Sequence, residues 1–280
     1  MAEKTKKVAL VTGASSGIGY DTAVNLVKAG YMVYGAARRT DLLGRLLAWG
    51  AKAISLDITS EESIQNCVNE VIKAEGKIDL LVNNAGYGLG GSIEDVPLEE
   101  AKKQFEVNVF GLARISQLVL PVMRKNGGGR IINISSMAGR FTSPFLGWYH
   151  ASKYCVESLS DAMRIENSSF GIKVILIEPG LIQTDWGKIA AENIRKFSGE
   201  GDSKNAADSV AKYYEKNYNP QNKKASNPSI VAKTIVKAAT AKNPKPRYLT
   251  GAYAKLFVFL KKHLSDKTYD KIVKSVLCKN

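Results

Sequence analysis

The feature that most constrains this chain is its first apolar run and the three glycines that follow. Residues 8–19 read Val-Ala-Leu-Val-Thr-Gly-Ala-Ser-Ser-Gly-Ile-Gly, and an amphipathic stretch follows over residues 20–30. A strand-length apolar run, a glycine turn and a helical stretch predict a β-strand joined tightly to an α-helix. Backbone amides at the start of such a helix are unpaired, and the helix dipole adds partial positive charge, so the turn suits a phosphate group. The spacing is G-x-x-x-G-x-G, which differs from the general G-x-G-x-x-G motif.

Apolar runs of strand length then alternate with stretches of helical period. Further strands are predicted at residues 31–37, 53–57, 78–82, 130–134 and 172–177. Helices are predicted between them at residues 42–49, 59–72, 98–125 and 149–169. The strands are apolar throughout rather than at alternate positions, which indicates a parallel sheet buried on both faces. We therefore predict a doubly wound α/β fold of the Rossmann type, in a single domain over residues 1–280.

The helix after residue 57 begins with a capping-box pattern. Thr59-Ser-Glu-Glu62 places a threonine three residues before a glutamate. In such a box each of the two side chains accepts a hydrogen bond from the backbone amide of the other residue. Thr59 is therefore predicted as the N-cap.

The composition changes after residue 184. Residues 185–228 are polar, contain Tyr213, Tyr214 and Tyr218, and are predicted to hold short helices in a mobile insertion. A helix capped by Pro228-Ser229 then extends to about residue 241, and a last strand is predicted at residues 247–249. We assign residues 185–228 to a substrate-binding lid and residues 244–280 to a C-terminal extension.

Positive charge is concentrated in the last part of the chain. The formal net charge is +14, and residues 201–280 contribute +12 of it, with 17 Lys and Arg against 5 Asp and Glu. We interpret this excess as a lysine-rich solvated face. Nucleic-acid binding is disfavoured because no recognition motif or basic-aromatic stripe accompanies the charge.

Several other classes of protein are disfavoured. No uninterrupted apolar run reaches membrane-spanning length, and residues 1–7 lack the apolar core of a signal peptide. Cys67, Cys155 and Cys278 form no CxxC pair, and the only two histidines are far apart, so no metal site is predicted. Scattered cysteines in odd number suit reduced thiols, and we expect a cytoplasmic protein.

Polar or glycine residues follow each predicted strand. They are the glycine turn, Arg38, Asp57, Asn83-Asn-Ala-Gly86, Ser135 with Ser136, and Pro179-Gly180. Ligands of open parallel sheets bind at the carboxyl ends of the strands. These residues are therefore predicted to share one cleft.

The end of the second strand indicates which dinucleotide binds. An acidic residue at this position would bond the ribose hydroxyls of NAD, whereas this chain has Arg38 and Arg39. Arginine pairs with phosphate through rigid, charge-assisted hydrogen bonds, so we predict NADP, with Arg38 preferred as its ligand. Asp41 keeps NAD as the alternative.

Tyr149 and Lys153 form the second chemical motif. Residues i and i+4 share a helix face, so the phenol and the ammonium group are predicted to lie together. A free phenol with a pKa of about 10 is a poor acid or base at neutral pH. A nearby ammonium group favours the phenolate, so Lys153 is expected to lower the pKa of Tyr149 towards the range useful for proton transfer.

These motifs together resemble the classical short-chain dehydrogenase/reductase family, over about residues 7–184. The resemblance rests on Thr12-Gly-Ala-Ser-Ser-Gly-Ile-Gly19, on Asn83-Asn-Ala-Gly86, and on Tyr149 and Lys153 with Ser136 thirteen residues earlier. That offset favours Ser136 over Ser135 as the catalytic serine. Asn108, in Val107-Asn-Val-Phe-Gly111, corresponds to the family's catalytic asparagine.

The resemblance implies roles for these four residues. Tyr149 would exchange a proton with the substrate oxygen, and Ser136 would hydrogen-bond the same oxygen. Lys153 would bind the nicotinamide ribose, and Asn108 would hold a water that links Lys153 to solvent. The cofactor-binding residues that it implies, together with the two arginines, are Gly13, Ser15, Ser16, Gly17, Ile18, Gly19, Arg38, Arg39, Asp57, Ile58, Asn84, Ala85, Gly86, Tyr149, Lys153, Pro179, Gly180, Ile182 and Thr184.

The activity so implied is NADP(H)-dependent interconversion of an apolar carbonyl compound and its alcohol. Residues 34–39 and the C-terminal extension look similar to the hydroxysteroid- and retinol-dehydrogenase-like branch, so an NAD-dependent enzyme of that type is an alternative. A non-catalytic NADP-binding regulatory protein is a second alternative, which the intact tetrad disfavours. The side chains predicted to line the outer cleft are Tyr87, Leu89, Met137, Phe141, Phe145, Leu146, Trp148 and Trp186.

The expected partners are the small-molecule substrate and further copies of the chain. The family usually forms dimers or tetramers through the helices that carry Asn108 and Tyr149. Residues 252–264 predict a surface helix of apolar and lysine residues that could lie on an anionic membrane. Such a helix more often packs on its own domain or on a partner subunit, which we favour.

Overall fold

The first apolar run forms the central strand of a parallel sheet. In the computed structural model, which describes residues 6–219 and 221–278, every residue of β1 (Val8–Thr12) is buried. β1 pairs with β2 (Met32–Ala37) on one side and with β4 (Leu80–Asn83) on the other. The chain order reverses between β1 and β4, which is where doubly wound proteins bind their ligands.

The remaining strands extend the sheet in both directions. The described residues form seven parallel strands in the order β3-β2-β1-β4-β5-β6-β7. The outer ones are β3 (Lys52–Ser55), β5 (Gly129–Ile134), β6 (Ile172–Pro179) and β7 (Arg247–Thr250). The predicted doubly wound fold is confirmed, and the predicted strand boundaries are correct within about two residues.

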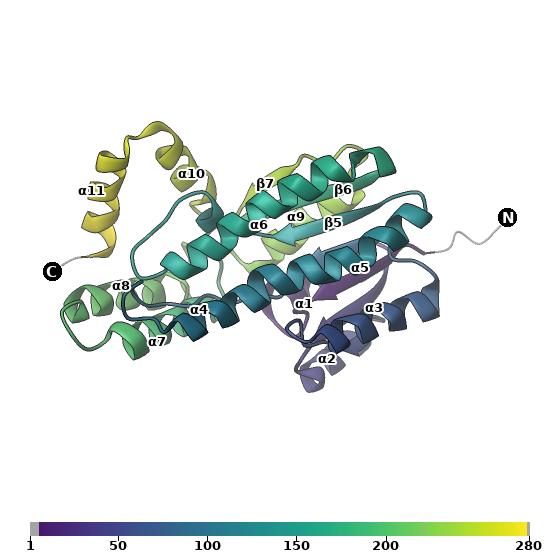
Figure 1. Ribbon diagram of the computed structural model, residues 1–280, viewed down its shortest axis with the longest axis horizontal. Coiled ribbons are helices and arrows are strands. Elements are labelled where there is room, and N and C mark those ends of the chain that lie inside the picture. The colour runs from purple at the N-terminus through teal and green to yellow at the C-terminus, as the bar shows by residue number, and fades with distance from the viewer. Residues whose placement is uncertain (1–5, 220, 279–280) are drawn as a thin grey trace.

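Helices cover both faces of the sheet (Figure 1). α1 (Gly17–Lys28), α2 (Thr40–Leu47) and α9 (Pro228–Thr240) pack on one face, and α3 (Glu61–Glu75), α5 (Leu112–Lys125) and α6 (Gly147–Glu166) on the other. Ala9 and Val11 join the first apolar core, whereas Val8 and Leu10 join the second. The strands are apolar throughout because both of their faces are buried.

The helical stretch Leu98–Lys125 is long and apolar enough to cross a membrane by length and composition alone. It consists of α4 (Leu98–Phe105), a π-helical turn η1 (Glu106–Gly111) and α5. Ile115, Val119 and Met123 of α5 are fully buried in the core beside α3. A core helix of this kind passes the same test, and the stretch serves here as a layer of the fold.

The predicted cap of α3 is wrong by one residue. Ser60 is the N-cap, and its hydroxyl accepts a hydrogen bond from the Ser63 amide at 3.3 Å. Thr59 is engaged elsewhere, because its amide and its hydroxyl both donate to the Asp57 carboxylate, at 3.0 and 2.7 Å. An aspartate that bonds the backbone two residues on forms a turn of its own, which competes with the capping box.

The two late segments are more regular than predicted. The insertion forms α7 (Trp186–Ser198) and α8 (Lys204–Asn217), which pack on each other, so the expected short helices are in fact full-length ones. The tail forms α10 (Ala254–His263), as predicted, and α11 (Asp266–Leu277), which was not predicted. Figure 1 shows these four helices at one end of the molecule, away from α2 and α3. Residues 1–5, 220 and 279–280 of the expected domain, lid and extension lie outside the described residues.

Candidate active site

The carboxyl ends of the strands open into one cavity of about 1110 Å³. Every residue predicted to bind the cofactor lines this cavity, and so do Ser136, Tyr149 and Lys153. Asn108 does not line it and lies behind its wall. The strand-end residues therefore share one cavity, as predicted. Of the four catalytic candidates, Asn108 alone does not line it.

The glycine turn leaves space where side chains would block a ligand. Gly13 and Gly17 have φ angles of +66° and +53°, which favour glycine. A Cβ atom on Gly19 would lie 2.2 Å from the Gly13 carbonyl oxygen. Ser16, the N-cap of α1, makes no side-chain capping bond, and the first turn of α1 contains no acidic residue. The turn thus has the free amides and the open cradle that a dinucleotide phosphate needs.

Hydrogen bonds between the ends of β1 and β4 hold this turn. The Thr12 hydroxyl accepts from the amides of Asn84 and Ala85, both at 3.0 Å. The Asn84 side chain donates to the carbonyl oxygens of Thr12 and Gly13, at 3.0 and 3.2 Å. Sequence reasoning treated Thr12 only as part of a motif and missed its structural role.

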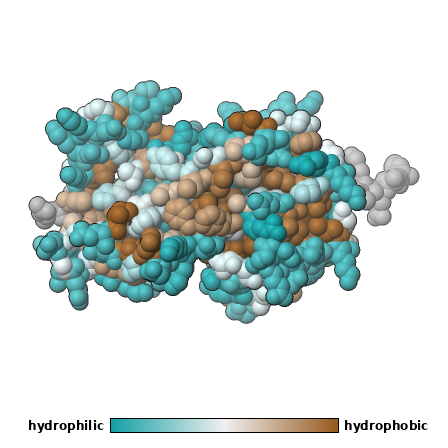
Figure 2. Space-filling view, viewed as in Figure 1, coloured by the Kyte–Doolittle hydropathy of each residue, from teal (hydrophilic) through white to brown (hydrophobic). Residues whose placement is uncertain are grey.

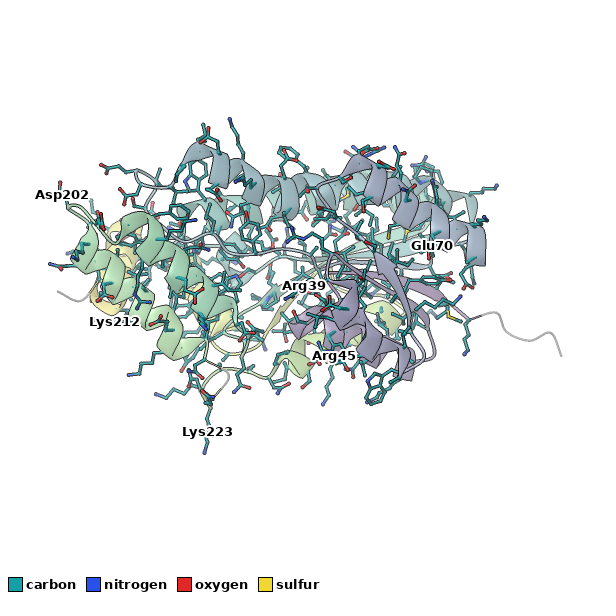
Figure 3. All side chains as sticks on the ribbon, turned by 90° about the horizontal axis from the view of Figure 1, so that it is seen from below. Arg39, Arg45, Glu70, Asp202, Lys212 and Lys223 are labelled. Carbon is teal, nitrogen blue, oxygen red and sulfur yellow. The ribbon has the colours of Figure 1, made fainter. Side chains whose placement is uncertain are left out.

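Two arginines lie beside the turn (Figure 3). Arg39 donates to the hydroxyls of Ser15 and Ser16 at 3.3 and 3.4 Å, and Arg45 donates to the Ser15 carbonyl at 2.9 Å. Arg45, in α2, was not among the predicted site residues. Arg38 is exposed at the rim of the cavity.

Asp57, which follows the neighbouring strand β3, is held as a carboxylate. Hydrogen bonds from the Thr59 amide and hydroxyl lower the pKa of Asp57, and the charge of Arg38 contributes in the same direction. Asp57 and Ile58 follow β3 and line the cavity together with Arg38. Asp41, the residue that would favour NAD, lies in the first turn of α2 and is not among the residues that line the cavity.

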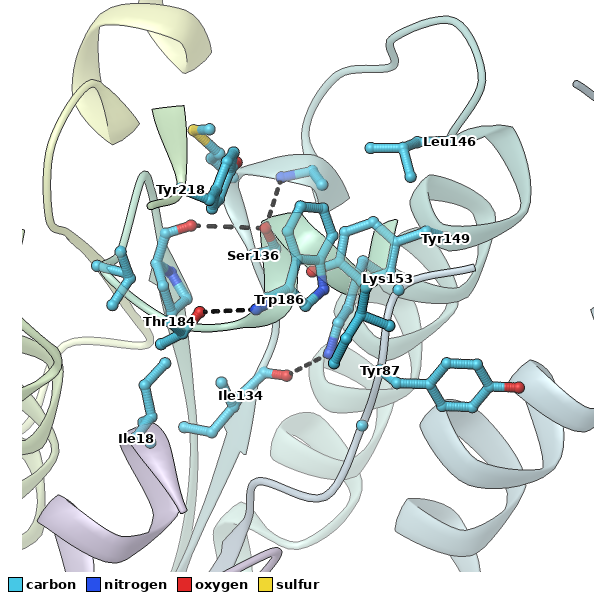
Figure 4. Close-up of a pocket in the computed structure, with 18 of the residues that line it drawn as sticks. Ile18, Tyr87, Ile134, Ser136, Leu146, Tyr149, Lys153, Thr184, Trp186 and Tyr218 are labelled. Atoms are coloured by element: carbon cyan, nitrogen blue, oxygen red, sulfur yellow. Dashed lines mark hydrogen bonds between the residues drawn. The ribbon is translucent and has the colours of Figure 1, made fainter. Parts of the chain in front are cut away.

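Ser136, Tyr149 and Lys153 come together deeper in the cavity (Figure 4). The Ser136 hydroxyl accepts from the Ala138 amide at 3.1 Å and donates to the Pro179 carbonyl at 3.5 Å. Lys153 Nζ donates to the Ile134 carbonyl at 2.9 Å and lies 5.9 Å from the centre of the Tyr149 ring. The β5 end and the first turns of α6 position all three side chains.

Burial dominates the protonation of this group. It raises the pKa of Tyr149 to about 12, opposed only by the Ser136 hydroxyl. It lowers the pKa of Lys153 to about 8, opposed by the nearby carboxylate of Glu157. The expectation that Lys153 lowers the Tyr149 pKa is therefore not what this structure shows. Desolvation by burial is the largest influence on the pKa of each group.

Asn108 lies in the π-helical turn η1 and supports the cavity wall. Its side-chain oxygen accepts from the Tyr87 amide at 3.0 Å, and its nitrogen donates to the Tyr87 carbonyl at 2.9 Å and to Ser152 at 3.1 Å. A Cβ on Gly86 would lie 3.1 Å from Asn108 Oδ1 and 3.7 Å from Lys153 Nζ. Asn108 Oδ1 and Lys153 Nζ therefore both lie close to Gly86. Single π-turns within helices are frequent at functional sites.

The outer wall differs in part from the predicted one. Tyr87, Met137, Phe141, Leu146 and Trp186 line the cavity as expected. Leu89, Phe145 and Trp148 were wrongly predicted to line it. Leu89 and Trp148 pack with Val96 and Ala101, and Phe145, with φ of +61°, packs against the α7–α8 core.

Aromatic side chains from the insertion form the wall instead. Trp186 packs against Tyr149 with ring centres 5.1 Å apart and the rings tilted by 52°, and it also contacts Tyr214 and Tyr218 at 5.8 and 4.9 Å. Further lining side chains come from α10 and α11. The period of apolar residues from Tyr269 to Leu277 was the signal that could have identified α11.

His150 joins the active-site helix to the insertion. Its Nδ1 lies 2.9 and 2.6 Å from the carbonyl oxygens of Ala138 and Phe141. Its Nε2 lies 2.9 Å from the Ser143 hydroxyl, which lies 3.1 Å from the Tyr214 hydroxyl. Complete burial lowers the pKa of His150 to about 4, so the ring is neutral at physiological pH. Over residues 6–219 and 221–278, no group of three or more His, Cys, Asp or Glu side chains could hold a metal ion.

The fold and the site together define a doubly wound dinucleotide-binding protein with a buried serine, tyrosine and lysine beside the dinucleotide turn. Comparison with known proteins specifies the family. Residues 7–194 match the family model described as short chain dehydrogenase. The chain belongs to the short-chain dehydrogenase/reductase family and is an NAD(P)-dependent oxidoreductase.

Two curated relatives are similar over nearly their whole length. A probable short-chain type dehydrogenase/reductase, VdlC, of Helicobacter pylori is 38% identical over 96% of this chain and 97% of its own. The 3-ketodihydrosphingosine reductase of Bacteroides thetaiotaomicron is 36% identical over 93% of this chain and 94% of its own.

Solved structures show the same architecture. A short-chain dehydrogenase from Streptomyces avermitilis superimposes with a TM-score of 0.80 at 34% identity, over 98% of this chain and 97% of its own. The closed form of a serine dehydrogenase with NADP+ has a TM-score of 0.76 at 26% identity, over 87% and 94%. The 3-ketoacyl-(acyl-carrier-protein) reductase of Brucella melitensis with NADH has a TM-score of 0.71 at 27% identity, over 87% and 96%.

The buried His150 predicts a loss of stability in acid. The unfolded chain binds a proton below a pKa of 6.5, whereas the folded chain stays neutral down to about 4, so stability falls as the pH drops between these values. At about pH 4.5 the contribution is roughly 2 to 3 kcal/mol.

Urea unfolding of the wild type and of His150→Gln at about pH 7.5 and about pH 4.5 measures this contribution. The difference in unfolding free energy between the two proteins should shift by roughly 2 to 3 kcal/mol in favour of the variant at the lower pH. His263→Gln, which removes the exposed histidine, is the matched control. An equal pH response in all three proteins would contradict the prediction.

Proposed function

We propose that the protein interconverts an apolar aldehyde or ketone and its alcohol with NADP(H). The observation that carries the proposal is that Ser136, Tyr149 and Lys153 open into the cavity that the glycine turn also lines. The apolar and aromatic outer wall supports an apolar substrate. A 36% identical relative is named as a reductase of a keto compound, which supports carbonyl chemistry.

The side chains would handle the proton and orient the substrate. When bound, the nicotinamide supplies the hydride to the carbonyl carbon, or accepts it from the alcohol. In reduction the carbonyl π bond breaks, and Tyr149 gives its phenolic proton to the carbonyl oxygen. Ser136 hydrogen-bonds the same oxygen and stabilises the charge that develops on it.

Lys153 and Asn108 would restore the proton on Tyr149. Tyr149 becomes a phenolate once its proton has left, and the Lys153 ammonium group stabilises that charge. Lys153 Nζ and Asn108 Oδ1 both approach Gly86, which supports a relay between them through a bound water. The raised pKa of Tyr149 keeps the phenol protonated at neutral pH, as an acid must be before it donates.

Arg38 and Arg39 would select NADP. Both line the cavity, and Arg39 donates to the hydroxyls of Ser15 and Ser16, so the adenosine phosphate of NADP would meet a guanidinium group there. A structural neighbour was solved with NADP+, which supports the choice, whereas another was solved with NADH. Asp41 remains the residue through which NAD would bind.

We also propose that the protein is a homodimer or homotetramer that assembles through α5 and α6. Figure 2 shows apolar residues gathered over these helices. Phe110, Tyr154 and Ile165 are exposed large apolar side chains on η1 and α6. Burying such a patch against a second copy removes apolar surface from water.

Tyr149→Phe removes the proton donor and keeps the ring. We expect turnover to fall at least about a hundredfold, because general acid catalysis contributes at least that much. NADPH affinity, measured by fluorescence titration, should be kept. Tyr154→Phe, an exposed tyrosine on the same helix, is the control and should match the wild type. Retained catalysis in Tyr149→Phe would refute the assignment.

The double variant Arg38→Ala/Arg39→Ala tests the nucleotide preference. It should raise the KM for NADPH at least about tenfold, the equivalent of one lost charge-assisted contact, and leave the KM for NADH nearly unchanged. Asp41→Asn is the companion variant. An unchanged KM for NADPH in the arginine variant, with a raised KM for NADH in Asp41→Asn, would instead show an NAD enzyme.

Phe110→Asp tests the assembly surface. Phe110 is 56% exposed, and a carboxylate there should lower the mass measured by light scattering to that of a smaller oligomer or monomer. Phe259→Asp is the matched control, because Phe259 is 59% exposed but lies on α10. A change of mass in the control alone would locate the interface on the tail.

A further inference from the structure

The cavity continues well beyond Tyr149 into the C-terminal part of the chain. Beyond Trp186 it extends between α8, which contributes Tyr213 and Tyr214, and α11. Phe257 and Leu260 of α10 line the same space. We call this region the outer arm of the cavity. The total volume of about 1110 Å³ is shared between this arm and the dinucleotide site.

The outer arm is uncharged. The charged side chains that line the cavity are Arg38, Arg39, Asp57, Lys153 and Asp185, and none of them belongs to α8, α10 or α11. A charged group on a ligand would find no partner of opposite charge in the arm, and burying an unpaired charge costs free energy. The arm therefore suits the hydrocarbon part of a ligand.

The arm is elongated along α11. Tyr269, Ile272, Val273, Val276 and Leu277 line it at spacings of three and four residues, so one face of α11 follows it for about 12 Å. At its inner end the rings of Trp186, Tyr149, Tyr214 and Tyr218 pack with centres 4.9 to 5.8 Å apart. Because the arm follows α11 for this length, an extended hydrocarbon chain would fill it better than a compact fused ring system.

The far end of the arm opens to solvent through apolar side chains. Ile272 and Val276 line the cavity and are also 37% and 43% exposed. Ile189 and Tyr253 likewise line the cavity and are exposed to solvent. If the hydrocarbon chain of a ligand is longer than the arm, an apolar mouth keeps the protruding part in contact with apolar side chains.

We propose that the substrate carries its carbonyl group on a long unbranched hydrocarbon chain, that the chain lies in the outer arm between α8 and α11, and that its end reaches the mouth at Ile272 and Val276. This inference rests on the proposed function, because it assigns the substrate class of the same site.

The first test is a series of straight-chain aldehydes from butanal to tetradecanal, with the preferred nucleotide in excess. The value of kcat/KM should rise by about fourfold for each methylene group buried, until the arm is filled. A decalone of similar carbon number should be a poor substrate. A flat series, or a decalone turned over better than the straight-chain aldehyde, would overturn the inference.

The second test changes the mouth. Ile272→Gln/Val276→Gln should lower kcat/KM for tetradecanal at least about tenfold and leave butanal within about twofold of the wild type. Leu256→Gln/Phe259→Gln is the matched control, because these residues are 50% and 59% exposed on α10 but do not line this cavity. Equal losses for both aldehydes, or the same loss in the control, would refute the assignment.

A binding measurement separates this inference from the proposed function. Calorimetric titration with tetradecanol and butanol needs no turnover. Tighter binding of tetradecanol, weakened in the Ile272→Gln/Val276→Gln variant, would support the arm even if no carbonyl compound were turned over and the proposed function had failed. Equal affinity for the two alcohols would refute the arm, whatever the activity.

Discussion

The hydrogen bonds that join the ends of β1 and β4 are the constraint on which the site depends. One hydroxyl, that of Thr12, accepts from two successive amides after β4, and the Asn84 side chain returns two bonds to the carbonyls after β1. These bonds lie where the strand order reverses, so they fix the distance between the glycine turn and Gly86. The glycine turn, the Asn108 wall and the Lys153 side chain are all placed relative to that junction.

Burial has opposite consequences for the two groups that would move protons. It makes the Tyr149 phenol a weaker acid and the Lys153 ammonium group a stronger one, so their pKa values move apart, to about 12 and about 8. Once Tyr149 had given up its proton, Lys153 would be the stronger acid beside it, so transfer of a proton from the Lys153 ammonium group to the phenolate would be favoured. The burial of both groups, and not their pairing alone, therefore sets the proton chemistry of the site.

The fold and the inner site could be predicted because short segments determine them. The glycine turn, the strand ends and the Tyr149–Lys153 spacing need only the local chain and the rule that ligands bind at carboxyl ends. The cap of α3 was misplaced because Asp57 competes for Thr59. Leu89, Phe145 and Trp148 were misassigned because tertiary packing sets the direction of their side chains. Leu89 and Trp148, 59 residues apart, pack in one cluster, and Phe145 packs against the α7–α8 core. Tertiary packing determines which side chains line the substrate cavity, so a local sequence pattern does not predict them.

The placement of α11 has a consequence for how such a protein can change. The residues that would carry out the reaction end with α6, whereas much of the outer wall of the cavity lies in the last part of the chain. Insertions, truncations or exchanges near the C-terminus would reshape what fits without disturbing the dinucleotide turn or Tyr149. The residues proposed to carry out the reaction and those that form much of the outer wall thus belong to different parts of the chain.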